Sequence, residues 1–387
     1  MLNFEHILPT KIYFGKGQLS NLKDEVLVCG SKVLLVYGGG SIKRTGLYDQ
    51  VLDQLADVQV FELSGIEPNP RLTTCQKGID ICKKEKIDLV LAVGGGSTMD
   101  SAKCIAAGAL YDGNVWDFYL KKAVPERALP IGCVVTLAAT SSQYNHISVI
   151  SNLDSNKKLP LMSVLTCPKF SICDPEYTFT VPQDQTAYGS ADMFVHACDQ
   201  YFSKTPGTAI QDYFGEGIMK TIIENAPLAL KNPRDYDSRA NLLWADCWAQ
   251  TQVNLKGKIG DASTHGIEHE LSAYYDITHG LGIAIVWPNW ARFVYKNNIP
   301  KFVRFAKNVW SLEQGTLSDE EYALKGIERT SDFFCSMGIP KTLSEIGITT
   351  EDHFSDMADS IVASRGRGGW DKNLGEPEYL QILKNCL

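Results

Sequence analysis

The sequence predicts an α/β domain over residues 1–182, followed by an all-helical domain over residues 183–387. In the first half, short β-branched apolar segments alternate with longer amphipathic ones, which is typical of a parallel sheet with crossover helices. Helical periodicity replaces this alternation after about residue 182, near Val181-Pro182. A chain of 387 residues is also long enough to bury two cores.

The individual elements follow from the same patterns. We expect strands at the short apolar runs 32–37, 58–63, 88–93 and 130–136. The helices expected between them cover residues 41–56, 71–86 and 97–106. In the second domain aromatic residues recur at helix-core spacing, and the expected helices are 187–203, 208–226, 238–255 and 318–337.

Composition excludes several classes of protein. The formal net charge of −8 argues against a surface that binds nucleic-acid phosphates or anionic lipid. Eleven scattered cysteines, an odd number without a CxxC pair, fit a reducing compartment better than a disulfide framework. The first residues show no signal peptide, and no apolar run reaches the ~18 residues of a membrane span. We therefore expect a cytoplasmic protein without nucleic-acid or membrane partners.

Two glycine triplets follow expected strands and precede expected helices. Gly95 and Gly96 would let a pyrophosphate approach the backbone, and the next helix would offer free N–H groups with Ser97 as the N-cap. The pattern is not GxGxxG, and a tight turn without a ligand is the alternative. Because the triplet at 38–40 has the same setting, we favour a cofactor with two ends, which makes this a dinucleotide-binding domain.

The first triplet also bears on which dinucleotide binds. An acidic side chain at the end of an early strand usually holds the ribose hydroxyls of NAD. Here the strand 32–37 is followed by Gly38, Gly39 and Gly40 and then by Ser41 and Lys43. Since a hydroxyl and an ammonium suit a 2′-phosphate, the sequence favours NADP(H) over NAD(H).

Histidines and one aspartate gather in the second domain. Four of the seven histidines lie within residues 196–279. Asp192 and His196 are four residues apart, as are His265 and His269, so each pair would share one face of a helix. His279 follows a short segment that could turn the chain back. Each histidine alone could be structural, but together they predict a site for Fe²⁺ or Zn²⁺ with one position open for substrate oxygen.

These motifs, in this order, resemble those of the iron-containing alcohol dehydrogenases. They are GGGSxxDxAK at 94–103, GxxDxxxH at 189–196 with Tyr201, and HxxxHE at 265–270 with a histidine fourteen residues after the first. The resemblance covers nearly the whole chain and implies the two-domain fold of the dehydroquinate synthase type. With TyrGlyGlyGlySer at 37–41, the chain is most similar to the NADP-preferring butanol dehydrogenase/aldehyde reductase branch.

The resemblance implies a role for each matching residue. The metal ligands would be Asp192, His196, His265 and His279, with His269 near the nicotinamide as our candidate proton relay. Cofactor contacts are implied for Gly38, Gly39 and Ser41 at the adenosine, for Gly95, Gly96 and Ser97 at the pyrophosphate, and for Asp100, Thr136, Ser141 and Lys158. The chain departs from the family where GTGSE becomes Ala139-Thr140-Ser141-Ser142-Gln143. A homodimer is a further family expectation.

The expected function is hydride transfer between NADP(H) and a small primary alcohol or aldehyde. A glycerol dehydrogenase-like or other polyol dehydrogenase of the same fold is the near alternative. A remote one is a zinc protease, because residues 265–269 also read HxxEH with Glu268 as base. That reading explains neither the glycine loops nor the Asp192–His196 pair. A non-enzymatic nucleotide or metal sensor is the third alternative.

Overall fold

The computed structural model describes residues 1–368, 370 and 373–387, which form two units. The α/β unit comprises Ile7–Val181 and Asn232–Thr251, and the helical unit comprises Met1–His6, Pro182–Lys231 and Gln252–Leu387. The segment Asn232–Thr251 thus belongs to the α/β unit, although the expected division at residue 182 places it in the helical domain. Its helix α9 (Tyr236–Ala249) buries Leu243 and Cys247 in the core of the α/β unit.

The α/β unit is built on six parallel strands, in agreement with the predicted fold class. Their order across the sheet is β1-β8-β5-β4-β2-β3. The strands are β1 (Lys11–Phe14), β2 (Lys32–Tyr37), β3 (Gln59–Leu63), β4 (Leu89–Gly94), β5 (Ile131–Val135) and β8 (Phe170–Cys173). A separate antiparallel hairpin pairs β6 (Ile147–Asn152) with β7 (Lys157–Met162).

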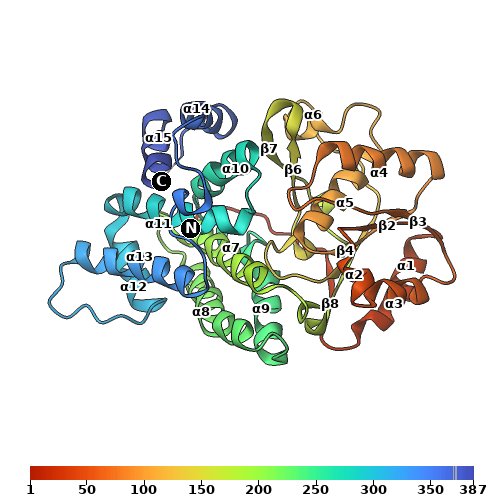
Figure 1. Cartoon of the computed structure of the whole chain (residues 1–387), viewed down its shortest axis with the longest axis horizontal. Coiled ribbons are helices and arrows are strands. Elements are labelled where there is room, and N and C mark those ends of the chain that lie inside the picture. The colour runs from red at the N-terminus through yellow and green to blue at the C-terminus, as the bar shows by residue number, and fades with distance from the viewer. Residues whose placement is uncertain (369, 371–372) are drawn as a thin grey trace. The chain divides into compact units, whose positions relative to one another are not determined.

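Both faces of the sheet are buried, because successive side chains of each strand enter opposite cores. Leu34 and Val36 of β2 belong to one core, whereas Val33 and Leu35 belong to the other. Figure 1 shows α4 (Leu72–Glu85) and α5 (Gly96–Ala109) on one side of the strands, and α1 (Leu22–Cys29), α2 (Ser41–Arg44) and α3 (Leu47–Gln54) on the other. This double burial explains why the strands are continuous apolar runs.

The expected single helix at 41–56 is wrong, because the chain forms two helices there. α2 ends at Arg44, and α3 begins at Leu47. Between them Gly46 has a φ of 77°, a left-handed conformation that glycine adopts without steric cost. The helix α6 (Trp116–Tyr119) completes the unit.

The glycine loops lie where the strand order reverses. The chain passes from β2 to the edge strand β3 and then crosses to β4 on the other side of β2. Since all strands run parallel, the loops after β2, β4 and β5 leave the same edge of the sheet. In open α/β sheets, ligands bind at the carboxyl ends of the strands at such a switch point.

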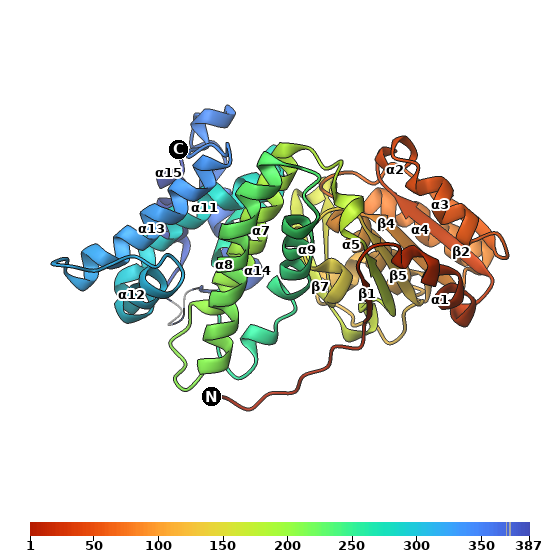
Figure 2. The ribbon, with the colours of Figure 1, turned by 90° about the horizontal axis from the view of Figure 1, so that it is seen from below.

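The second unit is helical, as predicted. Its α-helices are α7 (Gln183–Tyr201), α8 (Ala209–Lys231), α10 (Ser263–Tyr275), α11 (His279–Val294), α12 (Ile299–Asn308), α13 (Asp319–Ser336), α14 (Phe354–Arg365) and α15 (Glu376–Asn385). Figure 2 shows α7 and α8 side by side, and α11 packs against α7 as well. Phe194 of α7 contacts Trp287 of α11 and Phe305 of α12, which anchors α7 at the centre of an aromatic core.

The helices of the described residues include no candidate membrane-spanning segment. None combines the length and the apolar character that crossing a bilayer requires.

A network of charged side chains supports the segment that leads into α10. Asp212 of α8 lies 3.4 Å from the Lys258 ammonium and 2.7 Å from that of Lys301. Glu216, one turn further along α8, accepts a hydrogen bond of 2.5 Å from Nε of Arg304. These pairs fix residue 258 against α8 and α12 only a few residues before His265.

Lys103 of α5 predicts a specific pH dependence of stability. Its ammonium is fully buried, and it donates to Asn145 Oδ1 and to the Ile147 carbonyl at 2.8 Å each. Burial lowers the pKa of Lys103 from 10.5 to about 8, although the nearby Asp100 opposes this shift. Between these pH values the unfolded chain binds a proton that the folded protein does not, so this residue's contribution to stability rises with pH.

We therefore expect the difference in unfolding free energy between wild type and Lys103→Gln to grow from pH 8 to 10.5. The slope would be at most about 1.4 kcal/mol per pH unit, the value for one proton. Urea denaturation across this range measures it, with the exposed lysine variant Lys220→Gln as control. A pH-independent difference for Lys103→Gln would contradict the argument.

Candidate metal centre and cofactor loops

Three helices of the helical unit bring one carboxylate and three imidazoles together. α7 supplies Asp192 and His196 from one face, because residues four apart are neighbours on a helix. α10 supplies His265. The chain then turns at Asp276, which has a φ of 51°, and α11 begins at His279. One ligand atom from each of the four residues lies within 4.8 Å of the others.

Asp192 is the centre of this group. Its Oδ1 lies 3.4 Å from His196 Nδ1, 3.6 Å from His265 Nε2 and 3.5 Å from His279 Nε2. Ligands about 2.1 Å from a tetrahedral Zn²⁺ are about 3.4 Å apart. The separations therefore suit a common cation.

The burial of these atoms also fits a cation. Asp192 Oδ1 and His265 Nε2 are inaccessible to water, and neither makes a hydrogen bond with any residue that the structure describes. Buried polar atoms are costly to leave without hydrogen bonds. A divalent cation would satisfy both atoms, and the nitrogen and oxygen donors are those that Fe²⁺ and Zn²⁺ accept.

The electrostatics favour positive charge at this position. Burial opposes the charge of Asp192, but His196, His279 and His265 outweigh it and lower the pKa of this carboxyl well below its usual range. Burial likewise opposes protonation of His265. The carboxylates of Asp199 and Asp192 overcome that effect and raise the pKa of His265 to about 9.

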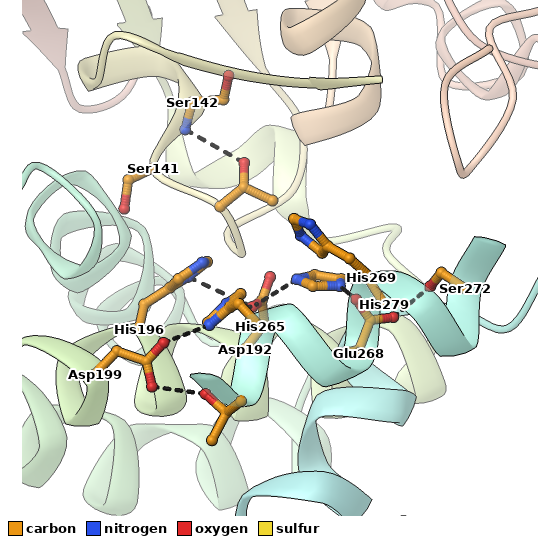
Figure 3. A network of polar contacts seen from close by, with 12 residues as sticks. Ser141, Ser142, Asp192, His196, Asp199, His265, Glu268, His269, Ser272 and His279 are labelled. Carbon is orange, nitrogen blue, oxygen red and sulfur yellow. Dashed lines mark hydrogen bonds and ion pairs between the residues drawn. The ribbon is translucent and has the colours of Figure 1, made fainter. Parts of the chain in front are cut away.

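In two of these imidazoles, Nε2 faces Asp192, and a further carboxylate contacts the other ring nitrogen, Nδ1 (Figure 3). Asp199 Oδ2 lies 2.6 Å from Nδ1 of His265, and its Oδ1 accepts a hydrogen bond from Thr264 Oγ1. Glu268 Oε2 contacts Nδ1 of His279, and its Oε1 accepts a hydrogen bond from Ser272 Oγ. Sequence reasoning missed the role of both. The contact of Asp199 joins α7 to α10, so it depends on how the two helices pack.

The contacts of Glu268 also count against the protease alternative. A protease base must be able to take a proton from water. Here both oxygens of Glu268 are already bonded, and the side chain is fully buried.

His269 lies beside the four residues without being one of them. It is buried, and its ring centroid is 5.6 Å from that of His279. Nη2 of Arg365 lies 2.9 Å from its Nδ1. Since a guanidinium has no acceptor, Nδ1 accepts this hydrogen bond and the proton of a neutral ring is on Nε2. His269 also forms a second group with Glu268 and His279, within 4.8 Å of one another.

In the α/β unit, the loop after β4 has the expected backbone but a different cap. α5 begins at Gly96 with Gly95 as N-cap, so the prediction of Ser97 as N-cap is wrong. Its hydroxyl donates to the Pro68 carbonyl instead. A Cβ at residue 96 would collide with Thr140, and one at residue 95 would crowd Leu137. These glycines therefore let the loop after β5 pack closely. The first N–H groups of α5 have no intrahelical acceptor and can bind an anion.

The loop after β2 leaves an exposed surface. Gly39, Ser41 and Lys43 are exposed, and Gly40 has a φ of 94°. The Lys43 ammonium lies over the rings of Tyr37 and Tyr48, 5.2 and 4.3 Å from their centroids.

One carboxylate lies near this loop, on the neighbouring strand β3. Glu62 accepts hydrogen bonds from the hydroxyls of Tyr37 and Tyr48 at 2.6 and 2.7 Å. Each carboxylate oxygen therefore already has one hydrogen-bond donor.

The loop after β5 is held by two aspartates, the fully buried Asp246 and the partly exposed Asp100. Ser141 has a φ of 54°, and its N–H donates to Asp246 Oδ1 of α9 at 2.7 Å. Gln143 Nε2 donates to the other oxygen of Asp246, also at 2.7 Å. Ser142 Oγ donates to Asp100 Oδ1 at 2.6 Å. Where the family reads GTGSE, Ser141 and Gln143 of this chain thus donate to both oxygens of Asp246. A glutamate at residue 143 would instead repel this carboxylate.

These contacts involve two of the predicted cofactor residues, Ser141 and Asp100. The hydroxyl of Ser141 is buried against the Asp246 carbonyl, and Asp100 bonds Ser142 and the N–H of Val149. Both placements give structural roles. Thr136 lies just after β5 and is partly exposed.

Lys158 takes a separate position on the β6–β7 hairpin. Its Nζ donates to Asn69 Oδ1 at 3.1 Å. The side chain is nearly buried, and it lies in the same unit as the glycine loops.

A parallel α/β unit with glycine loops and a helical unit with an aspartate–histidine centre together define a metal-dependent, nucleotide-linked oxidoreductase. Comparison with known families agrees. Residues 9–175 match the model of the iron-containing alcohol dehydrogenases, and residues 186–387 match that of the family's C-terminal domain. The chain therefore belongs to the iron-containing alcohol dehydrogenase family.

Individual relatives match over most of the chain. It is 45% identical to NADH-dependent butanol dehydrogenase A of Clostridium acetobutylicum, over 99% of both proteins. It is 40% identical to the NADPH-dependent aldehyde reductase YqhD of Escherichia coli, over 90% of both. The crystal structure of NADH-dependent butanol dehydrogenase A from Thermotoga maritima superposes with a TM-score of 0.94, at 39% identity, and covers 100% of this chain and 99% of the other. This protein is accordingly a metal-dependent alcohol dehydrogenase/aldehyde reductase.

Gly280 predicts how the packing of α11 against α7 affects the metal centre. A Cβ at residue 280 would collide with the backbone carbonyl of Tyr188, so Gly280→Ala must move the start of α11 and His279 with it. We expect a loss of about 1–3 kcal/mol in stability, as for overpacked cores, together with a reduced metal content. Metal analysis and thermal unfolding measure both effects.

Gly217→Ala is the matched control, since a Cβ at residue 217 of α8 would meet nothing within 4 Å. Full metal content in Gly280→Ala would mean that this helix contact does not position His279.

Proposed function

We propose that Asp192, His196, His265 and His279 bind one divalent cation, Fe²⁺ or Zn²⁺, in an NADP(H)-linked enzyme that interconverts small primary alcohols and aldehydes. The convergence of four ligand atoms within 4.8 Å carries this proposal. When bound, such a cation polarises a carbonyl or stabilises an alkoxide, and the nicotinamide donates or accepts hydride.

The residues of this chain would prepare the reaction by holding and orienting the groups. Three protein ligands come from α7 and α10, and His279 completes the set from α11. A fifth or further position would remain for the substrate oxygen. For the proton that must reach or leave this oxygen, we propose His269 as relay. Its Nδ1 accepts a hydrogen bond from Arg365, so a neutral ring carries its proton on Nε2, the atom that we propose for the transfer.

The cofactor would bind at the glycine loops of the α/β unit. We propose that Gly95, Gly96 and Ser97 face the pyrophosphate, because the N-terminus of the 14-residue helix α5 offers backbone N–H groups. Gly38, Gly39 and Ser41 would face the adenosine end. Asp100, Thr136, Ser141 and Lys158 stay proposed contacts, and Asp100 and Ser141 would also shape the loop after β5.

NADP(H) is the proposed dinucleotide even though relatives of both preferences exist. Ser41 and Lys43 are exposed after β2, where a 2′-phosphate could bond a hydroxyl and an ammonium. The nearby carboxylate of Glu62 already accepts hydrogen bonds from two tyrosine hydroxyls, which leaves it fewer lone pairs for the ribose hydroxyls of NAD.

Location, assembly and domain division also stay proposals. The eleven cysteines are all free thiols, which supports a reducing compartment such as the cytoplasm. We propose a homodimer and, for the domains, the boundary at residue 182 with α9 assigned to the α/β domain.

His265→Ala tests the ligand set. We expect the variant to lose both tight metal retention and turnover, because one of four donors is removed from a buried site. Metal-stripped wild type and variant would be reloaded with Fe²⁺ or Zn²⁺. Bound metal and NADPH oxidation against a panel of aldehydes would then be measured. The exposed histidine variant His6→Ala is the control. Full metal retention in His265→Ala would refute the ligand assignment.

Gly38→Asp tests the dinucleotide preference. A Cβ at residue 38 would lie 3.6 Å from the Ile66 carbonyl, an ordinary contact, so the variant should fold. We expect the new carboxylate to repel the 2′-phosphate and accept ribose hydroxyls, which would raise KM for NADPH about tenfold or more relative to NADH. Steady-state kinetics with both cofactors decides. An unchanged ratio of kcat/KM values would mean that the 2′-phosphate binds elsewhere.

A further inference from the structure

The α10 carboxylate Glu268 is buried at the metal centre without being one of the four proposed ligands. Its side chain is fully inaccessible to solvent, and its two oxygens bond Ser272 Oγ and His279 Nδ1. A Cβ at residue 282 would lie 3.0 and 3.2 Å from Glu268 Cγ and Oε1, so Gly282 leaves room for this carboxylate. Burying a charge is costly unless it is paired. The packing around Glu268 therefore indicates a specific role.

His279 is the ligand that most needs support. The other three side chains are at most 8% exposed, whereas that of His279 is 22% exposed. It is the first residue of α11, directly after the short turn from α10, so no preceding helical turn fixes its ring. The positive end of a helix dipole also lies at this position and would repel a cation.

The contact with Glu268 offsets both weaknesses. A carboxylate accepts only, so Nδ1 of His279 must carry the proton, and the lone pair is on Nε2. Nε2 is the atom that lies 3.5 Å from Asp192 Oδ1. The negative charge of Glu268 also compensates the helix dipole. We propose that Glu268 is a positioning residue, which holds His279 in the tautomer and orientation that bind the cation and thereby slows the cation's release.

This inference rests on the proposed ligand set and extends it by one residue. Asp199 provides a parallel case, because it contacts Nδ1 of His265 in the same way and is itself held by Thr264. Hydrogen bonds that metal-binding histidines donate to carboxylates commonly raise metal affinity, and their removal lowers it about 10- to 100-fold.

Glu268→Gln is the test, because the amide keeps the size of the side chain and removes the charge. We expect the dissociation constant for Zn²⁺, measured by competition with a chelating dye on metal-stripped protein, to increase about 10- to 100-fold. The melting temperature of the metal-stripped protein should change little. The control is Glu270→Gln, which alters another buried carboxylate of α10 that accepts a hydrogen bond from Ser360 instead of a histidine. Its Zn²⁺ affinity should stay within about twofold of wild type.

The outcomes separate this inference from the proposed ligand set. Loss of Zn²⁺ binding in His279→Ala together with unchanged affinity in Glu268→Gln would overturn the role of Glu268 alone. Retention of Zn²⁺ in His279→Ala would overturn the ligand set itself. Should Glu268→Gln fail to fold, Ser272→Ala decides, because it removes only the hydroxyl that holds the carboxylate. Several-fold weaker Zn²⁺ binding there supports the inference, and unchanged binding overturns it.

Discussion

The approach of three imidazole nitrogens to one buried oxygen of Asp192 is the constraint on which the helical unit depends. The three separations, 3.4 to 3.6 Å, require α7, α10 and α11 to keep their mutual positions. Phe194 and Trp287 pack α7 against α11, and Gly280 permits their close approach. The aromatic core of this unit can therefore be understood as the support of its polar centre.

Local patterns in the sequence sufficed for much of the fold and for the candidate ligands. Strand β2 follows from one apolar run, and the pair Asp192 and His196 follows from helical spacing. The contacts of Asp199 and Glu268 depend on how helices pack, so spacing along one helix did not reveal them. The same reason explains Ser141, whose conformation is set by an aspartate 105 residues away.

The candidate sites of the two units favour charges of opposite sign. In the helical unit, the carboxylates of Asp199 and Asp192 favour positive charge at the candidate metal centre. In the α/β unit, the N-terminus of α5 favours negative charge. The carboxylates of Glu62 and Asp246 accept hydrogen bonds there from hydroxyl, amide and backbone donors.

The assignment of α9 to the α/β unit has a consequence for dissecting the protein. The chain leaves the α/β unit after Val181, returns at Asn232 and leaves again after Thr251. A fragment cut at residue 182 would lack Asp246, and the backbone N–H of Ser141 and the amide of Gln143 would lose their acceptor. Independent expression of the α/β unit would therefore require residue 181 to be joined to residue 232, so that α9 is kept.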